Sequence, residues 1–229
     1  MCHCSPRRGP FILSHMDIAF VLYEHMTALD LVGPYEVLAS HPEARPRFVA
    51  DHVGAIRCDN GLTLCSDTTF DVVPTPELIV VPGSSHWRAV LDDRTLVDWL
   101  ASVHTKATWT TSVCTGATLL AKAGMLAGRP ATTHWLARDV LAALGAVVST
   151  DRVVFDGDVV TCAGVSAGID MALALAATLW GEQTARAIQL GIEYDPQPPF
   201  DSGSPDKASA EMVASVRAML DRERATNRA

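Results

Sequence analysis

The chain has 229 residues, a formal net charge of −8, and 48 % hydrophobic but only 6 % aromatic residues. This length suits one domain with a well-buried core of Ala, Val and Leu, as α/β sheets usually have. The acidic balance and the lack of a basic stripe give no electrostatic support to nucleic-acid binding. The longest apolar runs are too short to span a membrane.

Six cysteines lie at positions 2, 4, 58, 65, 114 and 162, without paired spacing except in the first residues. The start of the chain lacks the apolar run of a signal peptide, so we expect free thiols in a reducing cytoplasm. Cys2, His3 and Cys4 could bind a metal, but three adjacent ligands cannot close a tetrahedral site alone. We therefore expect no metal, a tail over residues 1–15 and a single domain over residues 16–229.

Short apolar strands alternate with helices along the chain. The first half predicts strands over 17–23, 47–53, 77–81 and 107–113, helices over 28–39, 92–105 and 115–124, and a hairpin over 56–70. The second half predicts a strand over 131–135, helices over 136–144, 166–180, 183–192 and 207–224, a hairpin over 152–162 and a proline-rich loop over 193–205. This alternation predicts an α/β fold with a doubly wound parallel sheet.

Cys114 lies at the turn between the strand over 107–113 and the helix over 115–124. A side chain at such a corner points out at the top of the sheet, against the first N–H groups of the helix. This is the nucleophile-elbow arrangement, with sulfur in place of oxygen. A helix N-terminus lowers the pKa of a thiol, and the thiolate is the reactive form. We expect a reactive Cys114; the alternative is a buried, inert cysteine.

Two further groups follow strand ends, where ligands bind in such sheets. Asp30 comes one loop after the first strand, and Gly83 and Ser84 follow the strand over 77–81. The glycine turn can aim backbone N–H groups into a crevice, or it can be only a tight connection. Asp30 could instead cap the helix that starts near it, a helix that we expect to carry Pro34 near its first turn.

Two histidines also follow predicted strands. We expect His86 to be a surface loop residue. His134 could support the site or donate to a nearby carbonyl, and we favour the structural role.

At these positions the sequence resembles the superfamily that contains DJ-1 and the PfpI-type intracellular proteases, and within it the isonitrile hydratases. The resemblance includes the motif Ser112-Val113-Cys114-Thr115-Gly116 and the segments 29–37, 81–83, 131–135, 165–170 and 189–205. It covers nearly the whole chain from residue 16 onward.

The resemblance implies a flavodoxin-like three-layer sandwich, usually a homodimer, with no metal or organic cofactor. It implies that Cys114 is the nucleophile, Asp30 the acid/base carboxyl and Thr115 a residue that binds or orients the reacting group. The substrate would be a small isocyanide, and the groups expected around it are Gly83, Ser84, Gly116 and His134.

Two positions depart from relatives. PfpI-type proteases carry His directly after the cysteine, where this chain has Thr115, so we do not expect peptide hydrolysis. Most relatives have Gly-Gly after the strand proline, whereas this chain has Gly83-Ser84, which reduces the backbone freedom of the second residue.

An isonitrile, R–N≡C, needs a proton and a nucleophile on the same carbon. We expect Asp30 to supply the proton as Cys114 attacks, and then to activate the water that hydrolyses the resulting thioimidate. Backbone N–H groups near Ser84 and Thr115 would stabilise the developing charge.

Two other functions stay open. One is a glyoxalase-like hydratase acting on α-oxoaldehydes. The other is a non-catalytic sensor, either of a ligand, as in relatives fused to AraC-type regulators, or of oxidants through Cys114. Direct control of DNA is not expected, because the charge is negative and no helix-turn-helix pattern follows residue 225.

Overall fold

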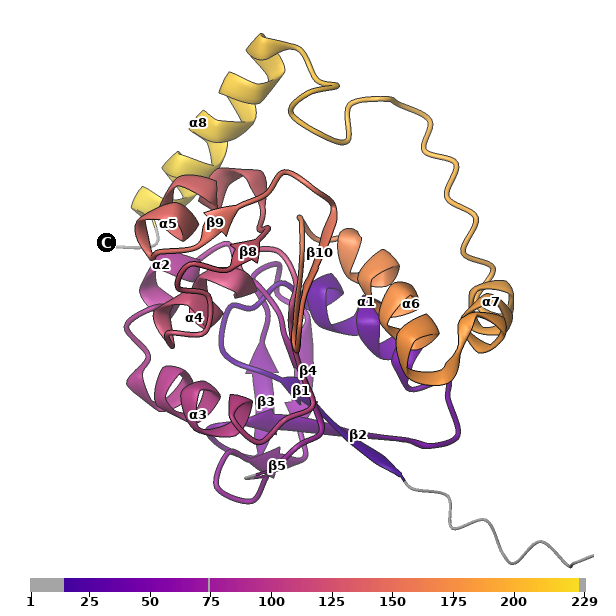
Figure 1. Cartoon of the computed structure of the whole chain (residues 1–229). Helices are drawn as coiled ribbons and strands as arrows, with labels where there is room; N and C mark the ends of the chain where they lie inside the picture. The colour runs from indigo at the N-terminus through magenta and orange to yellow at the C-terminus, as the bar shows by residue number, and fades with distance from the viewer. Residues whose placement is uncertain (1–14, 74, 227–229) are drawn as a thin grey trace, which may run out of the picture.

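The computed structural model describes residues 15–73 and 75–226 (Figure 1). Its strands are β1 (Met16–Val21), β2 (Ala44–Ala50), β3 (Gly54–Arg57), β4 (Thr63–Ser66), β5 (Thr68–Thr69), β6 (Leu78–Val81), β7 (Trp109–Ser112), β8 (Pro130–Ala131), β9 (Val147–Val148), β10 (Val153–Asp156) and β11 (Val159–Cys162). Its helices are α1 (Ala28–Leu38), α2 (Trp87–Val90), α3 (Arg94–His104), α4 (Gly116–Lys122), η1 (Trp135–Ala137), α5 (Arg138–Ala143), α6 (Ala167–Trp180), α7 (Glu182–Gly191) and α8 (Ala210–Thr226). Of the expected tail, all but His15 lies outside these residues, including Cys2, His3 and Cys4.

The central sheet has the strand order β10-β11-β7-β6-β1-β2-β5. Its pairings are parallel except that of β10 with β11, which form the expected antiparallel hairpin. From β1 the chain moves to β2 on one side, and it later returns to β6 on the other side. The order therefore reverses between β1 and β6, and a crevice forms outside the ends of strands at such a point.

Helices cover both faces of the sheet (Figure 1). Helices α1, α6 and α7 pack together on one face, and α3 and α4 pack together on the other. This is the expected three-layer, flavodoxin-like arrangement. Helix α8 lies beyond these layers near α5, with the Arg217 guanidinium 5.2 Å from the ring centre of Trp135.

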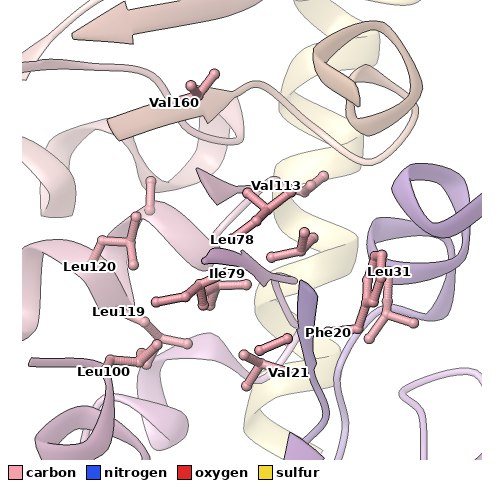
Figure 2. Close-up of a cluster of buried hydrophobic side chains, with 14 of the residues drawn as sticks. Phe20, Val21, Leu31, Leu78, Ile79, Leu100, Val113, Leu119, Leu120 and Val160 are labelled. Carbon is pink, nitrogen blue, oxygen red and sulfur yellow. The ribbon is translucent and has the colours of Figure 1, made fainter. Parts of the chain in front are cut away.

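The core fills the space between the sheet and the two helix layers (Figure 2). Burying a Leu, Val, Ile or Phe side chain contributes about 1.5–3 kcal/mol. The buried side chains drawn from the strands and helices include Phe20, Val21, Leu31, Leu78, Ile79, Leu100, Leu119, Leu120 and Val160. This packing fixes the strand ends from which the site is built.

Two local expectations are wrong. Pro34 is the seventh residue of α1, not part of its first turn. Its ring packs on Gly168 of α6, where an added Cβ would lie 3.1 Å away. The strand expected over 131–135 ends at Ala131, because side chains replace the ladder: Thr132 N–H donates to Thr161 Oγ1, and Thr133 Oγ1 donates to the Cys114 carbonyl.

Candidate active site

Cys114 forms the sharp corner between β7 and α4. Its φ is +56°, a left-handed conformation that costs a non-glycine residue about 1–3 kcal/mol. Its neighbours hold this strain: Cys114 N–H donates to the Ala163 carbonyl and Val113 N–H donates to the Val81 carbonyl, both at 3.0 Å. The expected elbow is confirmed.

Asp30 is the third residue of α1, and Thr27 occupies the N-cap position, so the capping alternative is wrong. The Asp30 carboxyl is fully buried, and its Oδ2 accepts the Gly83 N–H at 2.8 Å. Its Oδ1 has no hydrogen-bond partner of ordinary geometry in the described part of the chain, although the carboxyl interacts with the Cys114 thiol. A buried, unpartnered carboxyl oxygen beside a thiol indicates a functional group.

Burial raises the pKa of Asp30 to about 7, although the Gly83 N–H and the Cys114 thiol oppose the rise. The nearby Asp59 carboxylate raises it further. A carboxyl with this pKa can exchange protons at neutral pH, as an acid/base catalyst must.

Burial also raises the pKa of the Cys114 thiol well above its usual range, and the negative charge of Asp30 adds to the rise. The lowered pKa that the helix N-terminus is expected to give is therefore wrong. The backbone N–H groups of Val165 and Thr115 hydrogen bond to the sulfur and lower its pKa, but they do not outweigh burial of a side chain that is 5 % exposed. The thiol keeps its proton until a base takes it, and Asp30 is the base beside it.

The turn after β6 orients Asp30 and Thr115. Its N–H groups already have acceptors within the protein and are not free to donate to a substrate. Gly83 N–H bonds Asp30, and Ser84 N–H donates to Thr115 Oγ1 at 2.8 Å. The Thr115 hydroxyl in turn donates to the Ser84 carbonyl at 3.1 Å. Only glycine fits at position 83, because an added Cβ would lie 2.6 Å from the Thr115 nitrogen. The expected role of Ser84 N–H as a charge-stabilising donor does not match this geometry.

Gly116 and His134 support the corner from either side. Gly116 N–H donates to the Val113 carbonyl, and an added Cβ would lie 2.4 Å from the Val81 oxygen. Nδ1 of His134 accepts the Leu136 N–H at 3.3 Å. The His134 ring also lies against Gly164, where an added Cβ would be 2.5 Å from Cδ2. These contacts of His134 are structural.

Sequence reasoning missed three residues of the site. Val165, at φ +23°, directs its N–H at the Cys114 sulfur. Thr133 Oγ1 donates to the Cys114 carbonyl at 2.8 Å, and Tyr23 OH donates to the Pro82 carbonyl at 2.7 Å. Each of these residues follows the end of a strand within three residues. This position in the sequence could have identified them as candidate site residues.

A cavity of about 860 Å³ adjoins the site at Tyr23 and is lined also by His25, Asp59 and His86. It provides space for a small molecule beside Tyr23. Among residues 15–73 and 75–226, no three His, Cys, Asp or Glu side chains converge to hold a metal ion. In the same residues, no helix is both long enough and apolar enough to cross a bilayer.

Several known proteins are similar to this chain. The model of the DJ-1/PfpI family matches residues 16–178. The chain is 44 % identical over 202 residues to the isonitrile hydratase of Pseudomonas putida, covering 88 % of this chain and 89 % of that protein. It is 33 % identical to the HTH-type transcriptional regulator CdhR of Pseudomonas aeruginosa, covering 78 % of this chain but 54 % of the regulator.

Solved structures agree with the fold. A ThiJ/PfpI family protein from Pseudomonas syringae has a TM-score of 0.86 at 33 % identity, covering 96 % of this chain and 94 % of that one. DJ-1beta of Drosophila melanogaster has a TM-score of 0.71 at 20 % identity, covering 80 % of this chain and all of that one. Since the family model spans most of the sequence, and a ThiJ/PfpI family protein at 33 % identity has the same fold over nearly all of both chains, the chain belongs to the DJ-1/PfpI family.

Proposed function

We propose that this protein is a cofactor-independent isonitrile hydratase, which converts an isocyanide and water into an N-substituted formamide. The observation that carries the proposal is the buried pair of Asp30 and Cys114, in which one carboxyl oxygen is unpartnered beside a thiol on a strained corner. Identity of 44 % to a protein named isonitrile hydratase supports the same reaction.

In the first step one proton moves and one bond forms. The Asp30 carboxylate takes the thiol proton of Cys114 and passes it to the terminal carbon of R–N≡C, while the sulfur attacks that carbon. The product is a thioimidate, R–N=CH–S–Cys114, and Asp30 is a carboxylate again. A pKa of about 7 suits Asp30 to both halves of this transfer.

In the second step water replaces the sulfur. Asp30 accepts a proton from water as the water oxygen attacks the thioimidate carbon, and it passes this proton to the nitrogen. The C–S bond then breaks and releases R–NH–CHO, and Asp30 transfers the hydroxyl proton of the tetrahedral intermediate to the sulfur, which restores the thiol. The N–H groups of Val165 and Thr115 stabilise the leaving sulfur anion, because both hydrogen bond to Cys114.

The other expected site residues act through this pair. The Thr115 hydroxyl and Ser84 hold each other through two hydrogen bonds. Gly83 orients the carboxyl through its N–H. We propose that Thr115 orients the pair through its backbone N–H and its bond to Ser84.

We also propose a homodimer in a reducing cytoplasm. Cys58, Cys65, Cys114 and Cys162 are free thiols, and the apolar side chains of Leu190 and Phe200 are 81 % and 79 % exposed. Light scattering after gel filtration, on the wild type and on Phe200→Asp, tests the assembly. A monomeric wild type contradicts it.

A paired turnover assay tests the function. Wild type and Cys114→Ala are each given cyclohexyl isocyanide and methylglyoxal, and the products are measured. We expect N-cyclohexylformamide from the wild type and none from Cys114→Ala. Turnover of methylglyoxal alone would indicate the glyoxalase-like alternative. Turnover of neither substrate would indicate a sensor, for which the partial similarity to CdhR gives a precedent.

A further inference from the structure

The loop over residues 163–166, between β11 and α6, contacts the cysteine twice. The Ala163 carbonyl accepts the Cys114 N–H at 3.0 Å, and two residues later Val165 N–H hydrogen bonds to the Cys114 sulfur. Val165 has a φ of +23°, which a β-branched residue keeps only when its surroundings enforce it. The structure must therefore fix this loop at both ends.

A polar cluster outside the site does so. The Arg152 cluster consists of Arg152, Ser166, Asp170 and Tyr194. Arg152 Nε donates to Asp170 Oδ2, and its Nη2 lies 3.4 Å from Ser166 Oγ. Tyr194 OH donates to the other carboxylate oxygen, Asp170 Oδ1, at 2.9 Å.

Arg152 is connected to both ends of the loop. Its carbonyl accepts the Ala163 N–H at 2.9 Å, which fixes the start of the loop. Its guanidinium reaches Ser166, the last residue of the loop, and Asp170 in the first turn of α6. Tyr194 is held by Gln189 of α7 through two bonds, Tyr194 N–H to the Gln189 carbonyl and Gln189 Nε2 to the Tyr194 carbonyl.

We propose that the Arg152 cluster positions the Val165 N–H on the Cys114 sulfur, so that Arg152, Asp170 and Tyr194 are positioning residues for the reaction. This inference rests on the proposed function. It also gives a role to the segment over 189–205, whose Tyr194 braces Asp170. The two oxygens of Asp170 accept from two different residues, Arg152 and Tyr194, so the carboxylate is fixed more tightly than in an isolated surface ion pair.

The test compares Asp170→Asn with a matched control. Asp170→Asn keeps the size of the side chain but removes the charge that Arg152 binds. The control is Glu182→Gln, which removes an exposed ion pair with Arg186 on α7, away from the loop. For each variant, kcat and KM are measured with cyclohexyl isocyanide. The rate of Cys114 alkylation by iodoacetamide is followed against pH by peptide mass spectrometry.

We expect Asp170→Asn to lower kcat about 10- to 100-fold with little change in KM, because removing one donor from a developing anion costs up to about 10²–10³-fold. The pH midpoint of Cys114 alkylation should rise, since the thiolate loses a donor. Arg152→Lys should give an intermediate value, and Glu182→Gln should match the wild type. A folded Asp170→Asn with wild-type kcat and an unchanged alkylation midpoint would overturn the proposal.

The readouts separate the two proposals. If the wild type does not hydrate isocyanides, the proposed function fails, but the alkylation profile still tests the cluster. If Asp170→Asn does not fold, as judged by circular dichroism, Tyr194→Phe removes a single hydroxyl from the same carboxylate. It should shift the alkylation midpoint in the same direction by a smaller amount, and an unchanged midpoint counts against the cluster.

Discussion

Cys114 and Cys162 are two buried thiols on neighbouring segments of the same sheet. Burial raises the pKa of both, and the negative charge of Asp30 is the second cause for both. They differ in backbone and partners. Cys162 ends the extended strand β11, where it pairs with Val153, whereas Cys114 lies on a left-handed corner.

The partners of the two sulfurs follow from this difference. The Cys114 sulfur interacts with the Asp30 carboxyl and with the N–H groups of Val165 and Thr115. The Cys162 sulfur packs in the core near the Cys114 N–H, which itself donates to the Ala163 carbonyl. A shifted pKa alone therefore does not identify the nucleophile, while the strained corner and the adjacent proton acceptor do.

The comparison predicts the largest effect for loss of the Cys114 sulfur. Cys114→Ala should lower the isocyanide turnover by at least about 10⁴-fold, because it removes the group that forms the covalent bond. Cys162→Ala should stay within a few-fold of wild type in kcat/KM, although it leaves a small cavity. Equal losses in the two variants would contradict the distinction between the thiols.

Asp30→Asn should lower kcat about 10²- to 10⁴-fold, the usual contribution of a general acid or base. It should also stabilise the fold at high pH. The folded pKa of Asp30 lies above its unfolded value, so the wild type is most stable when the carboxyl is protonated and loses stability as pH rises from about 4 to about 7. The loss is at most about 4 kcal/mol.

Urea unfolding at pH 4 and pH 8 measures this stability effect. Asp30→Asn should resemble the wild type at pH 4 and exceed it in free energy of unfolding at pH 8. A variant that is less stable than the wild type at pH 8 would show that the carboxylate is stabilised by partners, contrary to this account.

The pH dependence of the rate tests whether the Asp30 carboxylate takes the proton of the Cys114 thiol. Below about pH 7 Asp30 holds its own proton and cannot accept the one on Cys114, so kcat/KM should fall about tenfold per pH unit. Above about pH 7 kcat/KM should become independent of pH. A rate that is highest at pH 5 would require a protonated Asp30 from the outset and would contradict this scheme.

The smallest effect is expected for a substitution at Gly116, next to the corner between β7 and α4. Gly116→Ala should cost about 1–3 kcal/mol, because the new Cβ would lie 2.4 Å from the Val81 oxygen. The matched control is Gly191→Ala at the end of α7, where nothing lies within 4 Å of an added Cβ. It should be neutral or slightly stabilising. Thermal unfolding of both variants measures the difference, and equal melting temperatures would argue against a tightly packed corner.

The sequence predicts the sheet and the positions of Asp30 and Cys114, because parallel strands end at one edge and both residues follow strand ends. It does not predict the protonation state of Cys114. Burial decides that state, and burial depends on helices far away in the sequence. Val165 was missed for a related reason: its backbone N–H acts at the site, and a backbone group has no residue signature.

The turn at Gly83-Ser84 shows the same limit. The sequence indicates that N–H groups lie near the site, but not which acceptors they find. In the structure the Asp30 carboxyl accepts the Gly83 N–H, and the Thr115 hydroxyl accepts the Ser84 N–H. Donor availability depends on neighbours that only the folded chain brings together.

Trapping the covalent intermediate tests the central claim most directly. Wild type mixed with cyclohexyl isocyanide is quenched with acid within the first turnovers and analysed by peptide mass spectrometry. We predict that the peptide carrying Cys114 gains the mass of one isocyanide, and that no adduct appears on Cys162 or in Cys114→Ala. Steady formamide production by an enzyme whose Cys114 never carries that mass, at any quench time, would contradict the account.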